Sequence, residues 1–544
     1  MFRIKLTIML IIIVLFAFCN SMESFAFDYV INDFNFYPIL NTPRPPKGVT
    51  FQDPIFYTNI TRITDAPKDI PGGNYIFPGY PKHDMENADG TKLVLQSMKY
   101  PGWHIWNANP PYNKIKDIPP SLTQDIDPDV RWDATDPNIL YSTFTSKMYK
   151  YNVVTDQITL LHDFQADFPD KPIARVFTAE EGDSSGNSRY WFFKVRCFNT
   201  SHNPTWWDTA VIVYDKDYYG KDNGKIISTL NEGTPLFYQA LNYTDISFDG
   251  NWAFCTEPGL IYPRDLSSRA TVPIAGHADR AISREGKQVI FGGNQRWSGD
   301  GYTDMGPWTM MFDMETKAVT WLAKMGKGAG VYHISCNSLN TPGWGLVSVY
   351  GPSYPATPTS WDEHSIYMVE LTTRKDPPPR VWRVAHTHTV RKDYGDDSFA
   401  KINKRGTKIW FGSGWGQSHL DPGAQYDVYQ IDLPSTWYKD LMGYIPPTAS
   451  ITATPLSGKP PLTVNFMGSG KGDGTVVSYT WNFGDGATSN QQNVSHTYES
   501  PGGYTATLRV IDDKGAGGSA NTTINVLKSD TTPPAPPKGV KTIK

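Results

Sequence analysis

The chain has 544 residues, of which 13% are aromatic and 19% charged, and it carries 46 Gly and 43 Pro. This length exceeds that of one ordinary domain, so we expect two or three. The net charge of -4 offers no positive field that would hold nucleic acid or an anionic membrane surface. The abundance of turn formers and aromatic residues favours β architectures made of many short strands.

The N-terminus has the layout of an export signal. A short basic start is followed by an apolar run over residues 6–17 and by the small residues Ser24 and Ala26. This pattern predicts a signal peptide over residues 1–26, and a secreted or cell-surface protein that is not inserted in the membrane after cleavage. An uncleaved anchor and a lipoprotein signal at Cys19 are the alternatives.

One pattern recurs between about residues 50 and 440. A strand leads into a polar turn with Asp-Gly or an equivalent, and a strand of β-branched and aromatic residues follows. Copies of this pattern cover residues 87–95, 136–142, 186–193, 247–254, 283–291, 341–348 and 403–411. Repeats of roughly 40 to 55 residues with four short strands each are typical of propeller blades. The copies predict a seven-bladed β-propeller, with six or eight blades as alternatives.

A propeller must close into a ring, because each blade buries its faces only against its neighbours. Residues 60–65 precede the first copy and have the pattern of an outer strand that would complete the last blade. The repeat resembles that of TolB-like and oligogalacturonate-lyase-like propellers, whose blades carry a Ser-Pro-Asp-Gly turn. No copy here has all four residues of that turn.

A second domain follows a short linker. Residues 481–486 read Trp-Asn-Phe-Gly-Asp-Gly, and after His496-Thr497-Tyr498 an alternating strand spans residues 503–510. This segment resembles a PKD domain, an immunoglobulin-like β-sandwich that is common on exported microbial proteins. The resemblance implies a sandwich over residues 447–527, and residues 528–544 read as a Pro-rich linker or stub.

Histidines are the first candidate site residues. His277, His333, His386 and His388 lie in segments that we expect at the mouth of the central channel. In an extended chain His386 and His388 would point to one side, and converging neutral imidazoles suit Zn, Mn, Cu or Ni. Hydrogen bonding between blades is the alternative role.

The propeller resemblance gives these histidines a possible activity. Oligogalacturonate lyases hold a divalent metal with a His-x-His pair, and His386 and His388 match that motif. Arg383 stands where the family has Gln. The resemblance therefore implies a uronate lyase in which His277, His333 or Arg383 would serve as catalytic residues, since abstraction of a proton beside a carboxylate needs a base and a cation.

Two further sites follow from residue type. Exposed aromatic rings stack on sugars, which makes ligand-binding residues of Trp103, Trp106, Trp206 and Trp207; packing between blades is the alternative. Oxygen ligands in one loop could bind Ca²⁺, with a solvated hairpin as the alternative. These oxygens belong to Asp215, Asp217, Asp222 and Asn223.

Together these features favour an exported protein that binds a polysaccharide or a cell-surface protein through its propeller. The PKD-like module would serve as a spacer or an adhesion domain. A metal-dependent polysaccharide lyase, with Mn, Zn or Ca as its cofactor, is the rival hypothesis. A structural surface-layer component is the third.

Overall fold

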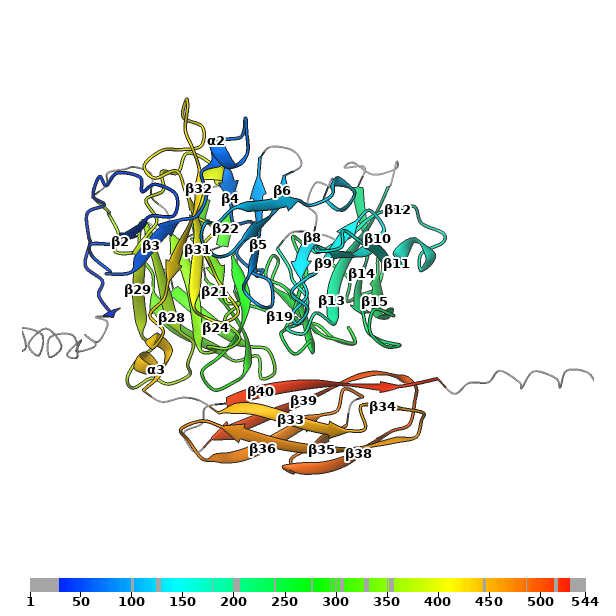
Figure 1. Cartoon of the computed structure of the whole chain (residues 1–544). Coiled ribbons are helices and arrows are strands. Elements are labelled where there is room, and N and C mark those ends of the chain that lie inside the picture. Colours follow the sequence, from blue (N-terminus) through cyan, green and yellow to red (C-terminus); the bar gives the residue numbers. More distant parts are fainter. Residues whose placement is uncertain are drawn as a thin grey trace, which may run out of the picture.

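The structure is a computed structural model that is almost entirely β (Figure 1). The predicted signal peptide and residues 529–544 lie outside the part of the chain that it describes. The described residues are 29–98, 102–123, 129–179, 181–198, 206–238, 241–274, 277–294, 296–298, 301–303, 308–326, 332–349, 351, 357–443, 447–485, 487–512 and 517–528.

Seven antiparallel sheets of four or five strands follow one another along the chain and confirm the seven-bladed propeller. Blades one to three contain β4 (Ile76–Phe77), β5 (Lys92–Ser97), β6 (Trp103–Asn107) and β7 (Lys114–Asp117); β8 (Asp129–Trp132), β9 (Ile139–Phe144), β10 (Lys147–Asn152) and β11 (Ile158–Asp163); and β12 (Ile173–Phe177), β13 (Tyr190–Phe198), β14 (Trp206–Asp215) and β15 (Lys225–Asn231). Blades four and five contain β16 (Asp245–Ile246), β17 (Trp252–Cys255), β18 (Leu260–Pro263) and β19 (Ala270–Thr271); and β20 (Ala278–Ile282), β21 (Gln288–Gly293), β24 (Trp308–Asp313) and β25 (Val319–Lys324). Blades six and seven contain β26 (Tyr332–Ser335), β27 (Trp344–Val349), β28 (Ser365–Glu370) and β29 (Val381–His386); and β30 (Lys401–Ile402), β31 (Lys408–Ser413) and β32 (Asp427–Asp432).

The N-terminal segment completes the last blade, as the sequence predicts. Strand β3 (Asn59–Arg62) pairs with β32, so that Ile60 lies opposite Ile431 and the ring closes. Strand β2 (Thr50–Gln52) adds a fifth strand beside β3, and β1 (Val30–Ile31) adds one to blade six along β29. The segment before the first repeat therefore ties blades six and seven together.

Local hydrogen bonds explain the repeated turn that joins the first and second strands of each blade, here called the inner turn. Asn87 Oδ1 accepts from the backbone N–H groups of Thr91 and Lys92, both at 2.9 Å, and Asn403 does the same in blade seven. Gly90 has a φ of 74°, a conformation that favours glycine. Ser247 and Ser283 accept similar bonds in blades four and five, whereas Asp133 in blade two bonds the nearer N–H groups of Thr135 and Asp136. The turn chemistry is set within a few residues in each case.

Bulky aromatic side chains fill the space between blades. Trp106, Trp191, Trp382 and Trp410 are all fully buried. The segment of Trp103 and Trp106, which the sequence placed in a loop-like context, is strand β6 instead.

The second domain is a two-sheet sandwich. One sheet contains β33 (Thr448–Thr454), β35 (Leu462–Lys471) and β38 (Asn493–Tyr498). The other contains β34 (Ser457–Gly458), β36 (Val476–Asn482), β37 (Thr488–Ser489), β39 (Gly502–Asp512) and β40 (Gly517–Val526). Trp481 is fully buried between them, and the Tyr498 hydroxyl donates to the Phe483 carbonyl at 3.0 Å.

Few segments are helical. They are α2 (Ala66–Asp69), α3 (Trp437–Met442), η1 (Pro120–Leu122), η2 (Phe164–Ala166) and η3 (Tyr394–Asp396). A separate two-stranded hairpin, β22 (Arg296–Ser298) and β23 (Gly301–Thr303), lies between β21 and β24 of blade five. Within the described ranges, no helix has the length and hydropathy that crossing a membrane requires.

The sandwich packs against one face of the propeller (Figure 1). The Gly503 N–H donates to the Tyr218 carbonyl at 2.5 Å, and Arg509 Nη2 donates to the Glu285 carbonyl at 2.5 Å. Arg189 donates to the hydroxyl of Thr505. Glu285 belongs to the inner turn of blade five, so the sandwich sits on the face of the inner turns.

Shortening one buried side chain on β3, the strand that closes the ring, tests this architecture. Ile60 is 0% exposed and packs in the core shared by blades six and seven, so Ile60→Ala should lower the free energy of unfolding of the propeller by about 2–5 kcal/mol. Ile158→Ala is the matched control, because Ile158 is 39% exposed on an outer strand and should cost about 0.5 kcal/mol or less. Urea unfolding followed by Trp fluorescence measures both. Equal losses would contradict the role given to β3.

Candidate functional site

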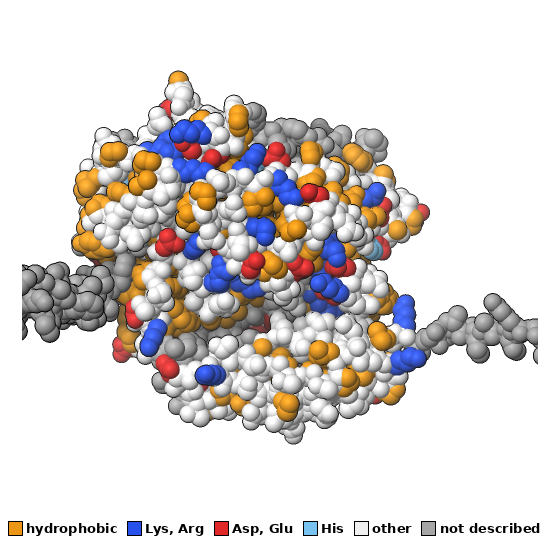
Figure 2. Space-filling model, in the orientation of Figure 1, with side chains coloured by type: hydrophobic (Ala, Val, Ile, Leu, Met, Phe, Trp, Pro, Cys, Tyr) orange, Lys and Arg blue, Asp and Glu red, His pale blue; other side chains and the backbone are white. Residues whose placement is uncertain are grey.

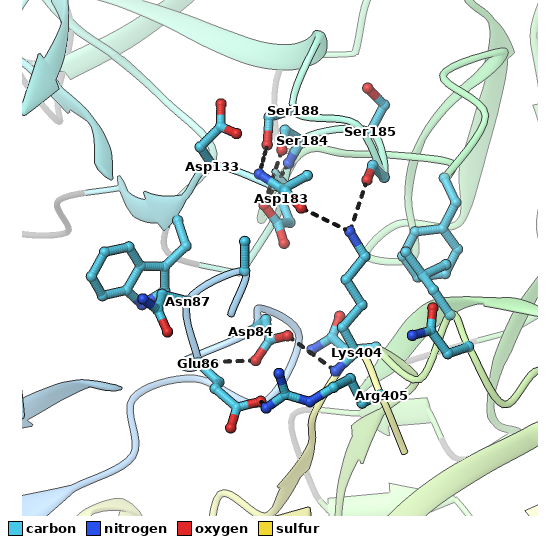
Figure 3. Close-up of a pocket in the computed structure, with 18 of the residues that line it drawn as sticks. Asp84, Glu86, Asn87, Asp133, Asp183, Ser184, Ser185, Ser188, Lys404 and Arg405 are labelled. Carbon is cyan, nitrogen blue, oxygen red and sulfur yellow. Dashed lines mark hydrogen bonds and ion pairs between the residues drawn. The ribbon is translucent and has the colours of Figure 1, made fainter. Parts of the chain in front are cut away.

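The inner turns meet around the channel axis and enclose a cavity of about 260 Å³, here called the channel-end pocket (Figure 3). All seven blades contribute to its wall, from Asp84 in blade one to Lys404 and Arg405 in blade seven. All of the residues that line it belong to the propeller. The inner turns that line it lie on the face of the propeller on which the sandwich sits.

Lys404 is the central side chain of this pocket. It reaches from blade seven across the cavity, and its Nζ donates to the carbonyls of Ala134 at 3.2 Å and Gly186 at 3.5 Å (Figure 3). Among the described residues, no carboxylate oxygen lies within 4.0 Å of this ammonium group. Burial lowers the pKa of Lys404, while the nearby carboxylates of Asp84 and Asp133 oppose that shift.

The other two cations of the pocket have carboxylate partners. Arg405 Nη2 lies 2.6 Å from Glu86 Oε2, and Arg280 Nη2 lies 3.0 Å from Asp183 Oδ2. Lys404 is therefore the cation that an anionic group entering the pocket could reach without breaking an ion pair.

Asp84 brings an unusual carboxyl group to the same pocket. Its two oxygens accept from the backbone N–H groups of Glu86 at 2.9 Å and Lys404 at 3.0 Å. Burial raises the pKa of Asp84 to about 7, and the Glu86 carboxylate adds to the shift. Near neutral pH this group changes between a neutral and a charged form.

His277, directly before β20, and His333, on β26, form a separate group. Their ring centroids are 4.5 Å apart, and the Tyr80 hydroxyl lies 2.9 Å from His277 Nδ1. His333 Nε2 lies 3.0 Å from Asp397, which also accepts from Arg391 Nε at 2.8 Å. Desolvation, followed by the neighbouring His333, lowers the pKa of His277, so we expect a neutral ring at pH 7.

His386 and His388 lie elsewhere, in blade six. His386 is the last residue of β29, and His388 follows shortly after that strand. Both are buried, and their ring centroids are 6.2 Å apart. His388 stacks on Trp415 at 4.0 Å, and burial followed by the neighbouring His386 lowers its pKa to about 3. The structure thus pairs the four predicted histidines two by two, and it does not gather them at one point.

The surroundings of His386 fit those of a metal ligand. Its Nδ1 lies 3.0 Å from Asp53 Oδ2, while its buried Nε2 has no hydrogen-bond partner in the described structure. Histidines that bind metals usually donate their other ring nitrogen to a carboxylate in this way. His364, which the sequence analysis did not single out, is buried close enough to contribute to the low pKa of His388.

The backbone around the pair is also unusual. His364, His388 and Trp415 have φ values of 55°, 51° and 48°. Side chains other than glycine rarely adopt this conformation, and such residues concentrate at functional sites.

Arg383, the remaining catalytic candidate, is buried under the N-terminal segment. Its Nη1 donates to the Asn35 carbonyl at 2.8 Å and its Nη2 to Ser365 Oγ at 3.0 Å. Its guanidinium lies 4.7 Å from the centre of the Phe56 ring, against which His386 also packs. These contacts hold the N-terminal segment to blade six, and a catalytic role for Arg383 stays a prediction.

The four tryptophans differ in their exposure. Trp103 is 5% and Trp106 0% exposed, so these rings have the packing role that the sequence left as the alternative, and they present no open face to a sugar. Trp207 is half-buried, and its Nε1 donates to Glu232 at 2.5 Å. The side chain of Trp206 lies outside what the structure describes.

Carboxylates proposed for Ca²⁺ have protein partners. Asp215 forms an ion pair with Arg189 at 2.7 Å, and Asp217 forms one with Lys216 at 2.7 Å. In the described part of the chain, a different group, Asp393, Asp396 and His419, brings three potential metal-binding atoms within 4.8 Å of one another. Asp396 already accepts from the Lys392 and His419 backbones as part of a turn.

Sequence reasoning overlooked Lys404 and Arg405 as site residues. A signal was available, because these two basic residues occupy the inner turn of blade seven where the matching turn of blade one has Ala88 and Asp89. What the sequence could not show is that the side chain of Lys404 points toward the axis.

Comparison with known proteins identifies the second domain. Residues 445–526 match the family model of the PKD domain. The chain is 40% identical over 92 residues to collagenase ColQ1 of Bacillus cereus (strain Q1), which is 16% of this chain and 9% of that protein. It is 35% identical over 100 residues to a microbial collagenase of Vibrio alginolyticus, 18% of this chain and 12% of that protein. The chain thus spans only about a tenth of the length of these relatives.

Solved structures resemble each domain separately. The PKD1 domain of the Vibrio cholerae metalloprotease PrtV is 34% identical, with 15% of this chain and 99% of that chain covered and a TM-score of 0.14. An oligogalacturonate lyase from Vibrio parahaemolyticus is 11% identical, with 75% of this chain and all of that chain covered and a TM-score of 0.47. The chain therefore carries a PKD domain at residues 445–526 behind a β-propeller, a combination that fits an extracellular protein.

Proposed function

We propose that this protein is an extracellular binding protein whose channel-end pocket holds an anionic group of a polysaccharide. The observation that carries the proposal is the half-buried ammonium group of Lys404, which has only carbonyl partners. A carboxylate or sulfate that replaces those weak contacts would gain a charge-assisted hydrogen bond. An acidic segment of a surface protein offers the same chemistry and is the other partner class.

The setting of the pocket supports binding to an extended partner. The cavity is small for a drug-sized ligand, since pockets for such ligands usually enclose roughly 300–1,000 Å³. A polymer could place one charged group in it while the rest of the chain contacts the surrounding inner turns. The PKD domain lies on the same face and could contribute to such a surface.

The charge of Lys404 should decide binding. Lys404→Gln is expected to weaken binding of an acidic polysaccharide such as polygalacturonate at least about tenfold, which corresponds to about 1.4 kcal/mol. Lys404→Arg should retain most of the affinity. Isothermal titration calorimetry or biolayer interferometry measures the change, with a neutral glucan as the reference ligand.

Lys408→Gln is the matched control, because Lys408 Nζ bonds Gln430 on blade seven and does not line the pocket. Equal affinity of the parent and Lys404→Gln proteins for every acidic polysaccharide would contradict this proposal. So would the absence of binding to the acidic panel.

A divalent metal at His386 and His388 is a second proposal, favoured by the buried, unpartnered Nε2 of His386 and the carboxylate at its Nδ1. Asp53 would orient His386, and His388, neutral because of its low pKa, could supply a second nitrogen. A bound metal could polarise a carbonyl or carboxylate oxygen, as the rival uronate-lyase hypothesis requires. That hypothesis also needs an open cleft in which an arginine meets the histidines, and it stays a prediction.

Elemental analysis of the purified protein tests the metal proposal. About one Zn or Mn per chain is expected in the parent protein and almost none in the His386→Ala/His388→Ala double variant, because Zn²⁺ and Mn²⁺ accept imidazole nitrogens. His162→Ala is a suitable control, since His162 pairs with Asp167 on blade two. A parent protein without metal, or equal metal contents, would rule the site out.

A further inference from the structure

A second cavity, of about 150 Å³, lies where the sandwich meets the propeller, and we call it the interdomain cleft. Blade three contributes Arg189, Tyr190, Asp215 and Tyr218, and blade four contributes Arg264. The sandwich closes the other side with the backbone of three glycines and with Tyr504. In Figure 2, Lys and Arg side chains border the seam between the two domains on the propeller side.

The walls of the cleft are held by specific contacts between the domains. A side chain at Gly503 would place its Cβ only 2.2 Å from the Asp217 carbonyl oxygen, so the close approach of β39 requires glycine. Arg189 is almost fully buried and forms two 2.7 Å bonds with Asp215 while it also donates to Thr505. Specific contacts between the two domains therefore form the walls of this cleft.

Arg264 brings to the cleft a positive charge that has no ion-pair partner among the described residues, while Asp265, the next residue in the chain, interacts with that charge at longer range. Its guanidinium stacks 4.3 Å from the centre of the Tyr190 ring, and no carboxylate of the described residues lies within 4.0 Å of it. Asp215 is already paired with Arg189, and Asp485, next to Gly484, lies 2.7 Å from His496. An anionic ligand would meet one free guanidinium there.

Aromatic rings stand beside this charge. Tyr218 and Tyr504 are half-buried and line the cleft, and Tyr504 is braced by stacking on Tyr498 at 4.5 Å. Tyr190 also lines the cleft, but it is buried and its ring is covered by Arg264 and Arg189. Tyrosines offer apolar faces to a ring and hydroxyl groups to its substituents. Arginine recognises carboxylates through two parallel hydrogen bonds.

We propose that the interdomain cleft binds a carboxylate carried on a six-membered ring, with Arg264 on the carboxylate and Tyr218 and Tyr504 against the ring. Either an acidic sugar or an aromatic acid has this chemistry. The site is distinct from the channel-end pocket, and it exists only while the PKD domain is docked. The PKD domain thereby acts as one wall of a binding site.

Saturation-transfer NMR on the full chain tests this site with glucuronate and benzoate as probes, and with glucose and acetate as probes that lack the carboxylate or the ring. The Lys404→Gln background silences the channel-end pocket, so the two proposals can fail independently. Glucuronate, benzoate or both should bind in the millimolar range and at least tenfold more tightly than glucose and acetate. Whichever binds identifies the source of the ring.

Two variants locate the binding. Arg264→Gln should weaken it about tenfold or more, whereas Arg269→Gln, on the same blade but bonded to the Leu236 carbonyl, should leave it unchanged. Gly503→Val should separate the domains, increase the radius of gyration in X-ray scattering and abolish binding, while Gly502→Val, whose Cβ meets only Tyr504, should keep the domains docked. Glucuronate and benzoate that bind no better than glucose and acetate, or equally well to Arg264→Gln, would overturn the proposal.

Discussion

Closure of the seven blades into a ring holds this molecule together. No blade has a complete core of its own, and Ile60 on β3 supplies the N-terminal contribution to the core between blades six and seven. Closure brings the seven inner turns to one axis and so creates the channel-end pocket. The same N-terminal segment delivers Asp53 to His386. One strand pairing thus supports both candidate sites.

Charge burial gives the channel its chemical character. Burial raises the pKa values of three carboxyl groups near the axis, Asp84 to about 7, Asp245 to about 6 and Asp279 to about 8. Such shifts concentrate at functional sites, although buried structural ion pairs produce them too. Arg280 partly offsets the shift at Asp245. Lys404 differs from these groups because its ammonium meets only neutral oxygens within hydrogen-bonding distance.

Local signals explain how far the sequence could predict this molecule. In inner turns such as that of blade one, a side chain bonds backbone groups four or five residues away, as Asn87 does. The sequence of each blade segment therefore contains the signal for its own turn. The PKD signature is equally local, because Trp481 on β36 and Tyr498 on β38 lie close together in the sequence. The ring-closing strand β3 was predictable because the first and last blades of a propeller must join.

What the sequence could not predict arises from contacts between distant segments. Lys404 meets Ala134 and Gly186 only because seven blades converge, and Trp106 is buried because strand β6 faces a neighbouring blade. Nothing in the local pattern of Gly503 reveals that it touches Tyr218. Docking of the sandwich therefore places a module that we expected to be a spacer or an adhesion domain directly against the inner-turn face of the propeller.

Direct titration of the Lys404 ammonium group tests whether Lys404 is the cation that binds an anionic ligand in the channel-end pocket. Reductive ¹³C-methylation preserves the charge of lysines and gives each one an NMR signal, and Lys404→Arg assigns the signal of interest. We predict that Lys404 titrates below the usual lysine pKa of about 10.4 and that acidic polysaccharide raises its pKa, because a bound anion favours the charged form. A signal that titrates like those of exposed lysines and ignores the polysaccharide would contradict it.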